Sequence, residues 1–210
     1  AVDPVAERGC FRFGIARDGN VLAETQLQIP GRHHVGNALA AAAMCWHGGV
    51  PMDVVARILP DFAGAQRRLT LRGEVNGVTI VDDYAHHPEE LKACITSARK
   101  IFGKKKITGI FQPHLFSRTK NFYKEFAVSL SLLDQLFLLD IYPAREKPIE
   151  GVTSKIIFDN VTIQDKFLCN IDNLLDHMGK HRFEVVITMG AGNIDKMVQP
   201  IREMLEDTMK

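Results

Sequence analysis

The sequence predicts an α/β protein in which a doubly wound, mostly parallel sheet forms the larger part of the chain. From about residue 70 onward, short apolar and β-branched runs alternate with longer segments of helical periodicity. This alternation is typical of βαβ units with parallel strands. In addition, polar or glycine-rich segments follow four of the predicted strands, and such sheets place their sites just beyond the carboxyl ends of strands.

The composition is that of a folded protein with one large or two small domains. The chain has 210 residues, of which 46% are hydrophobic and 24% are charged. A formal net charge of +1 gives no reason to expect nucleic acid or an anionic membrane as a partner. No apolar run approaches the ~20 residues of a membrane span, and the N-terminus does not resemble a signal peptide. Four scattered cysteines without a CxxC pair predict reduced, mostly buried thiols in a cytoplasmic protein.

The first third of the chain predicts an incomplete structure. The expected elements are strands at 10–16 and 21–29, a helix at 38–46 and a second helix that begins at Pro51 and ends before Pro60. An isolated hairpin is marginally stable in water and needs more sheet or helices against its apolar face. We therefore expect that the chain begins inside a larger domain.

A domain boundary is expected near residue 69, where a small and basic segment precedes the regular alternation. This divides the chain into residues 1–68 and 69–210. The strands expected in the second domain are 70–75, 78–81, 107–111, 135–141, 165–169 and 184–189. The helices expected there are 88–102, 119–132, 153–159, 171–180 and 193–207.

The loop between the strand at 78–81 and the helix that begins at Pro88 has the densest load of polar chemistry. Residues 82–87 are two aspartates, a tyrosine, an alanine and two histidines. Their spacing matches no zinc pattern, and we assign no metal ligand. His87 directly precedes Pro88, and its simplest interpretation is a helix N-terminal residue.

Three further loops follow predicted strands, at 111–120, 140–148 and 190–193. Together with the first loop they predict a rim bearing His86, His114, Arg118 and Glu146. Such a rim suits a ligand with both a carboxylate and an ammonium group, because arginine binds carboxylates bidentately and glutamate can hold an amine. A surface ion pair is the alternative for Arg118. The glycines at 190 and 192 fit a phosphate-binding turn or a simple tight turn, since the third glycine of a dinucleotide fingerprint is absent.

In combination these motifs resemble the Mur ligases. The segments that carry the resemblance are 31–38, 67–68, 82–88, 111–119 and 190–192, and it extends over nearly all of residues 10–207. The resemblance implies that residues 1–68 are the tail of a central ATPase domain and that 69–210 form a Rossmann-like C-terminal domain. No loop ending in Gly-Lys-Ser/Thr occurs in the sequence, so we expect the chain to be a fragment that is inactive alone.

The resemblance also implies a reaction. ATP and Mg²⁺ would phosphorylate the carboxylate of UDP-N-acetylmuramate, and L-alanine would attack the acyl phosphate to form an amide in peptidoglycan precursor synthesis. These small molecules are the expected partners, and this fragment alone is not expected to bind ATP or Mg²⁺ tightly. A related ligase that recycles murein peptides is one alternative, and a non-catalytic module that binds a small ligand is another.

Residue roles follow from the same resemblance. The nucleotide contacts it implies are Asn37, Arg67, Arg68 and Tyr84. The catalytic positions it implies are His86, His114 and Arg118. The expected substrate contacts are Tyr84, His86 and Arg118, together with Glu146 because of its place on the rim, and Asp82 and Asp83 support the loop. His34 and Leu115 depart from the family pattern and receive no role.

Overall fold

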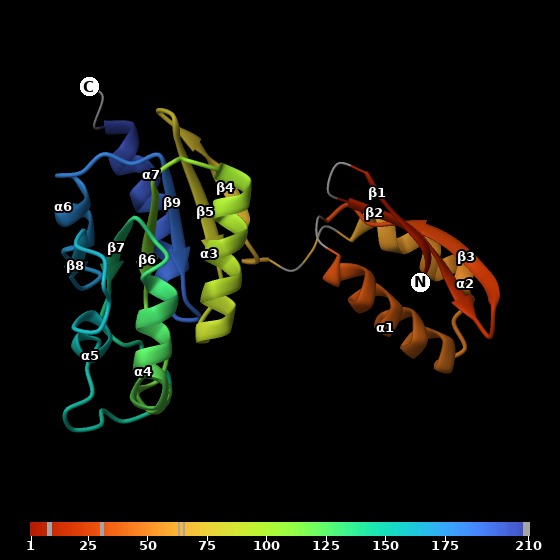
Figure 1. Cartoon of the computed structure of the whole chain (residues 1–210), viewed down its shortest axis with the longest axis horizontal. Helices are drawn as coiled ribbons and strands as arrows, with labels where there is room; N and C mark the ends of the chain where they lie inside the picture. Colours follow the sequence, from red (N-terminus) through yellow and green to blue (C-terminus); the bar gives the residue numbers. More distant parts are fainter. Residues whose placement is uncertain (8–9, 30–31, 63, 65, 208–210) are drawn as a thin grey trace. The chain divides into compact units, whose positions relative to one another are not determined.

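The computed structural model describes residues 1–7, 10–29, 32–62, 64 and 66–207. Gly31, part of the motif at 31–38, lies outside these residues. The chain forms two compact units, Ala1–Ala65 and Gln66–Lys210 (Figure 1). The division lies slightly before the boundary expected from the sequence, and each unit is described by itself.

The first unit is a small sheet covered by helices. Its strands are β1 (Val2–Glu7), β2 (Cys10–Arg17) and β3 (Asn20–Gln26), and its helices are α1 (His33–His47), α2 (Met52–Ile58) and the 3₁₀ helix η1 (Leu59–Asp61). The strands are antiparallel in the order β1-β2-β3. Phe13, Ile15 and Leu27 pack against apolar residues of α1 and α2 to form its core.

Two elements of this unit differ from the sequence-based expectation. β1 was not among the expected strands; it contains Pro4, which is tolerated because β1 is an edge strand. α1 begins at His33 instead of residue 38, so the motif residue Asn37 lies within the helix.

The second unit contains a six-stranded sheet. Its strands are β4 (Thr70–Val75), β5 (Val78–Asp83), β6 (Ile107–Phe111), β7 (Gln135–Leu138), β8 (Lys166–Leu168) and β9 (Val185–Met189). Its helices are α3 (Pro88–Phe102), α4 (Phe116–Leu130), α5 (Lys155–Phe158), α6 (Leu174–Met178), η2 (Ile194–Met197) and α7 (Val198–Asp207). The strand order is β4-β5-β9-β6-β7-β8, and only β4 is antiparallel to its neighbour among these strands.

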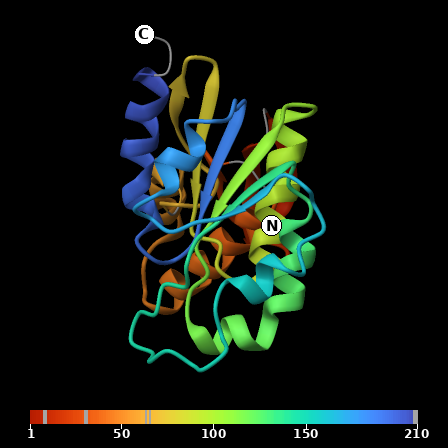
Figure 2. The ribbon, with the colours of Figure 1, turned by 90° about the vertical axis from the view of Figure 1, so that its left-hand side faces the viewer.

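Helices cover both faces of this sheet. One core contains residues of α3, α4 and α5, and the other contains residues of α6, η2 and α7. Figure 2 shows α7 on one side of the strands and α3 and α4 on the other. Every residue of β5, β6, β7 and β9 is buried, as expected for parallel strands covered on both faces. This confirms the predicted α/β fold with a doubly wound, mostly parallel sheet.

The connection between β5 and β6 creates the place for a site. The chain leaves β5 for α3 and returns at β6, while β9 lies between these two strands. β5 and β6 continue into α3 and α4 on one face of the sheet, whereas β9 continues into η2 on the other face, so the loops beyond these carboxyl ends diverge and leave a crevice. Among the described residues, no helix is both long and apolar enough to cross a lipid bilayer.

Candidate active site

The four loops singled out from the sequence follow β5, β6, β7 and β9, and the structure brings their side chains together at the carboxyl edge of the sheet. The rings of Tyr84 and His86 meet edge to face with centroids 5.2 Å apart. His86 in turn lies 6.0 Å from the ring of His114, and His114 stacks on Tyr142 at 5.7 Å. A continuous row of four rings therefore runs along this edge.

His86 is held by its own loop. Its Nδ1 lies 2.8 Å from the backbone oxygen of Tyr84 and 3.4 Å from Glu90 Oε2. Glu90 also accepts hydrogen bonds from the backbone nitrogens of His86 and His87 at 3.0 and 3.2 Å. His87 is the N-terminal cap of α3, as its position before Pro88 predicted.

His114 is held by the loop after β7. Tyr142 N donates to Pro113 O at 2.8 Å, and Leu115 N donates to Tyr142 O at 3.0 Å. Burial lowers the pKa of His114 below its usual value, and the positive charges of Arg118 and His86 act in the same direction. The imidazole is therefore neutral over a wider pH range than a free histidine.

Arg118 lies in the first turn of α4, beside the two histidines. Its Nη1 donates to the backbone oxygen of His86 at 3.5 Å, and the side chain is only partly buried. Among the described residues, Arg118 thus bonds to a carbonyl oxygen and forms no ion pair with a surface carboxylate, which was the alternative. The guanidinium has further donors for an anionic group.

Glu146 has a different environment from the one its predicted role requires. Its carboxylate accepts hydrogen bonds from the backbone nitrogen and the hydroxyl of Ser117, at the start of α4. The hydroxyl bond lowers the pKa of Glu146, with the backbone bond acting in the same direction. In this structure the carboxylate fastens the loop after β7 to α4, and an amine contact stays a prediction.

Arg67 and Arg68 differ in their contacts and in their exposure to solvent. Arg67 Nε donates to Asp82 at 2.9 Å, its Nη2 donates to Gly190 O at 2.6 Å, and its guanidinium lies over the ring of Tyr84 at 5.1 Å. Arg68 is half exposed, with Nη1 3.9 Å from Glu90. Arg68 is therefore the more accessible of the two predicted nucleotide contacts.

Asp82 and Asp83 support the loop. Asp82 is fully buried and also accepts a hydrogen bond from Thr188 at 2.8 Å. Asp83 accepts from the backbone nitrogens of Leu69 and Ala85 at 2.6 and 2.7 Å. Burial raises the pKa of Asp83 despite these two bonds. In the described part of the chain, no group of three or more His, Cys, Asp or Glu residues could hold a metal ion.

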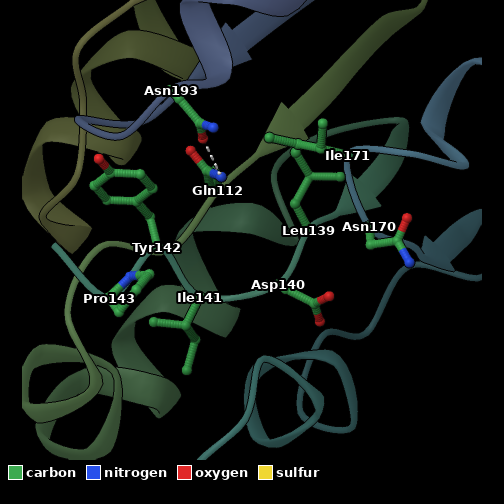
Figure 3. A pocket seen from close by; sticks show the side chains of 9 residues that line it. All are labelled: Gln112, Leu139, Asp140, Ile141, Tyr142, Pro143, Asn170, Ile171 and Asn193. Carbon is green, nitrogen blue, oxygen red and sulfur yellow. Dashed lines mark hydrogen bonds between the residues drawn. The ribbon is translucent and has the colours of Figure 1, made fainter. Parts of the chain in front are cut away.

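A hollow of about 220 Å³ adjoins the row of rings. Figure 3 shows Gln112 and Asn193 joined by a hydrogen bond of 2.9 Å, with Tyr142 beside them. Asp140 and Asn170 lie on the other side of the hollow. Its polar lining consists of amides, a carboxylate and a phenol, and none of these five residues was given a role from the sequence.

Comparison with models of protein families identifies the family of this chain. Residues 67–192 match the family model described as Mur ligase, glutamate ligase domain. The chain belongs to the Mur ligase family. The matched residues include the loops after β5, β6 and β7 and most of the loop after β9.

Three related Mur ligases illustrate the extent of the similarity. UDP-N-acetylmuramate--L-alanine ligase of Parabacteroides distasonis is 47% identical over 184 residues, which cover 88% of this chain and 40% of that protein. The crystal structure of UDP-N-acetylmuramate-alanine ligase from Thermotoga maritima is 26% identical, covers 98% of this chain and 45% of its own, and has a TM-score of 0.69. A murein peptide ligase from Psychrobacter arcticus shares the fold, with 22% identity, 97% and 43% coverage and a TM-score of 0.74. The chain thus spans less than half of the length of these relatives.

Two glycines of the Mur ligase chain are explained by packing. A Cβ on Gly192 would lie 2.4 Å from Gln112 Oε1 and 2.7 Å from Tyr142 Cγ. Gly190 has φ +146°, and a Cβ there would lie 2.8 Å from Gln112 O. Close approach of the backbone to Gln112, and at Gly192 also to Tyr142, disfavours a side chain at both positions, while binding of a phosphate by this turn stays a prediction.

The remaining predicted residue is Asn37. It lies on α1 of the first unit with an exposed side chain, and its role in nucleotide binding stays a prediction. Gln112 and Tyr142 were missed although both lie in loops that the sequence had marked. Only their position could have identified them. Gln112 directly follows β6 and Tyr142 lies shortly after β7, so both are close to the carboxyl edge of the sheet, where sites usually lie.

Proposed function

We propose that this chain supplies the amino-acid side and part of the nucleotide site of an ATP-dependent ligase that joins L-alanine to UDP-N-acetylmuramate in the cytoplasm, for peptidoglycan precursor synthesis. The names of the relatives in Parabacteroides distasonis and Thermotoga maritima support the substrates. The single structural observation that supports the chemistry is the convergence of His86, His114 and Arg118 at the carboxyl edge of the sheet.

The proposed reaction has two stages. ATP first phosphorylates the muramoyl carboxylate, which converts a poor leaving group into phosphate. The amine of L-alanine then attacks the acyl carbon. Both stages gather negative charge, which a guanidinium and an imidazole N–H can stabilise, while the amine needs a proton acceptor nearby. Arg118 has unused donors for the phosphate or the alanine carboxylate.

The residues of this chain supply groups for only part of an ATP-binding site. Tyr84 is 39% exposed and offers an aromatic face for a base, and the exposed guanidinium of Arg68 offers charge for phosphates. Mg²⁺ would neutralise phosphate charge during transfer. We assign it no ligand among the described residues of this chain, since no acidic or histidine cluster suits it.

A chimera tests the proposal. The region of the Parabacteroides distasonis ligase that matches this chain is replaced by this chain, and release of phosphate from ATP is measured with UDP-N-acetylmuramate and each of several amines. We expect turnover with L-alanine. A chimera that folds, binds ATP and turns over only with a peptide that begins with L-alanine would indicate peptide recycling instead. A folded chimera with no turnover on any amine would contradict ligase function.

A further inference from the structure

His86 and His114 lie side by side at the candidate site, yet their ring nitrogens have opposite surroundings. The hydrogen bonds of a histidine ring decide which nitrogen carries the proton in the neutral form. The environment of each Nδ1 therefore determines what the other nitrogen, Nε2, can do.

His86 has a hydrogen-bond acceptor at Nδ1. The backbone oxygen of Tyr84, 2.8 Å away, can only accept, so Nδ1 must carry a proton. Glu90 Oε2 lies 3.4 Å from the same nitrogen, close enough to stabilise a positive charge on the ring. In the neutral form Nε2 of His86 therefore bears a lone pair, the state of a proton acceptor.

His114 has the reverse situation. Its Nδ1 is buried and has no hydrogen-bond partner among the residues that the structure describes. A proton on this atom would be a buried donor without an acceptor, which is costly, and most costly in the charged ring. The favoured state is a neutral ring with its lone pair at Nδ1 and its proton at Nε2.

The position of the His114 ring is fixed independently of its protonation. It stacks on Tyr142, with an angle of 17° between the rings, and a parallel β-bridge joins the two backbones. Leu115, the next residue, is held at φ +74°, a conformation that side chains other than glycine rarely adopt. A ring fixed in this way presents Nε2–H in one direction.

The charges around His114 favour the same state. Arg118 on α4 and Arg145 on the loop after β7 carry a positive charge, and His86 on the loop before α3 adds a third positive charge when it is protonated. Glu146, on the loop after β7, acts on the ring in the opposite direction, and its carboxylate is held by Ser117. The pKa of His114 is lowered in net, since burial and the three positive groups outweigh Glu146.

We propose that the two histidines work in opposite tautomers: His86 accepts the proton of the attacking amine at Nε2, and His114 donates its Nε2–H to the negative charge that develops on the acyl group. The roles rest on the proposed ligase function, whereas the tautomers do not.

The step balances as follows. The nitrogen of the neutral amine forms a bond to the acyl carbon, and the carbonyl electron pair moves onto its oxygen, where the Nε2–H of His114 stabilises it. The oxygen re-forms the carbonyl as the bond between carbon and the phosphate oxygen breaks, and that electron pair leaves with phosphate. One proton passes from the nitrogen to Nε2 of His86, which becomes an imidazolium beside Glu90. The products are the amide and phosphate.

The exchanged assignment conflicts with the contacts. If His114 accepted a proton at Nε2, its Nδ1–H would be buried without an acceptor. If His86 donated from Nε2 in its neutral form, its Nδ1 would lose the proton bonded to Tyr84 O. One exchange leaves a buried donor without an acceptor and the other breaks a hydrogen bond, so the two roles are not interchangeable.

Nitrogen NMR of the 210-residue chain tests the tautomers without any activity. Long-range ¹H–¹⁵N spectra of ¹⁵N-histidine-labelled protein, recorded above neutral pH, distinguish a protonated from an unprotonated ring nitrogen. His86→Gln, His114→Gln and the exposed control His47→Gln assign the signals. We expect the proton on Nδ1 in His86 and on Nε2 in His114. The same tautomer in both rings, or the reverse pair, overturns the proposal.

Kinetics of the chimera test the roles. A glutamine amide can place an N–H near the position of Nε2 but cannot accept a proton at neutral pH. We expect His114→Leu to lower kcat by about 10²- to 10³-fold and His114→Gln by about tenfold or less. His86→Gln should lower kcat by about 10²- to 10⁴-fold and remove the acidic limb of the pH profile.

Two results would overturn the roles. One is equal loss in His114→Gln and His114→Leu, and the other is an acidic limb that persists without His86. If the spectra show the expected tautomers but the unmodified chimera ligates nothing, the proposed function fails while the tautomer assignment stands.

Discussion

Arg67 joins three segments of the second unit through one guanidinium group. It bonds to Asp82 in β5 and to the backbone oxygen of Gly190 after β9, and it covers the ring of Tyr84. Only 13% of its side chain is exposed, and none of that of Asp82. Removal of the guanidinium would leave a buried carboxylate with Arg72 and Thr188 as its remaining partners.

We predict that Arg67→Ala lowers the free energy of unfolding by about 3 kcal/mol, because it leaves a buried charge poorly compensated. Arg68→Ala is the matched control, since its side chain is 52% exposed and its ion pair spans 3.9 Å. Such pairs contribute about 0–1 kcal/mol. Chemical denaturation followed by circular dichroism measures both. Equal effects of the two variants would show that Arg67 does not hold the strand ends together.

Arg118 is predicted to bind the amino-acid side of the reaction and not the nucleotide. In the chimera, Arg118→Ala should raise KM for L-alanine by roughly 10- to 100-fold, in line with the loss of a hydrogen bond between charged groups. The affinity for ATP should change by less than about twofold. Lys120→Ala is the control, as an exposed cation on the same helix. A similar loss of ATP and alanine binding would remove the assigned role.

Glu146 provides a test of pH dependence. Its folded-state pKa lies below the ordinary value of 4.5, chiefly because Ser117 donates to it. A depressed carboxyl pKa contributes stability above pH 4.5, and the contribution is lost as the pH falls through the lower, folded-state pKa.

We therefore predict that Ser117→Ala raises the pKa of Glu146 toward 4.5, since the hydroxyl bond is the largest cause of the depression. Carbon NMR of the Glu146 carboxyl during an acid titration measures the shift. Ser97→Ala, on the exposed side of α3, should leave the titration unchanged. An unchanged pKa in Ser117→Ala would mean that the hydroxyl does not govern Glu146.

At the scale of elements, β6 depends on a glycine in its centre. A Cβ on Gly109 would lie 2.4 Å from Leu133 Cδ1 and 2.8 Å from Met189 Cε. Overpacking of a dense core typically costs about 1–3 kcal/mol. The close packing keeps β6 beside β9, and through them the loops that bear His114 and Gly190.

We predict that Gly109→Ala lowers the free energy of unfolding by about 1–3 kcal/mol. The contrast is Gly36→Ala on α1, where, among the described residues and apart from the neighbouring residues and backbone of the helix itself, no atom lies within 4 Å of the added Cβ. Alanine in a helix is more favourable than glycine by about 0.8–1 kcal/mol, so this variant should be neutral or stabilising. Thermal denaturation of both variants measures these changes in stability. Stabilisation by Gly109→Ala would show that the core around β6 has spare volume.

The elements that the sequence predicted well are those with strong local signals. β5, α3 and β6 agree closely with expectation, because β-branched runs, a proline start and helical periodicity coincide there. α5 and α6 are shorter than expected, because the residues at both of their ends form turns or bends instead of helix. The local sequence pattern does not distinguish a short helix from a turn at these positions.

At the scale of the whole molecule, the sheet order brings the site together. The sequence predicted that His86, His114 and Arg118 share a rim, because parallel strands end at a common edge. It did not predict that β9 lies between β5 and β6, since that order depends on contacts between distant segments. For the same reason the stacking of Tyr142 on His114 and the contact of Glu146 with Ser117 were missed.

We predict that the 210-residue chain alone does not release phosphate from ATP in the presence of L-alanine and UDP-N-acetylmuramate. The physical reason is that no Gly-Lys-Ser/Thr loop is present in its sequence to hold the phosphates. A coupled phosphate assay compares the chain with the chimera at equal concentration. Turnover by the chain above the buffer rate would contradict this, and would require the phosphates to be bound by other residues.

The left-handed backbone at Leu115 has a consequence for evolution. The residue adjoining His114 is held in a conformation that costs on the order of 1–3 kcal/mol for a side chain other than glycine. Replacement by glycine would relieve that cost, but it would also free the segment that aims the imidazole. Selection for thermostability and selection for turnover would then favour different residues at this position, which makes it a place where homologues adapted to heat and to fast growth are expected to diverge.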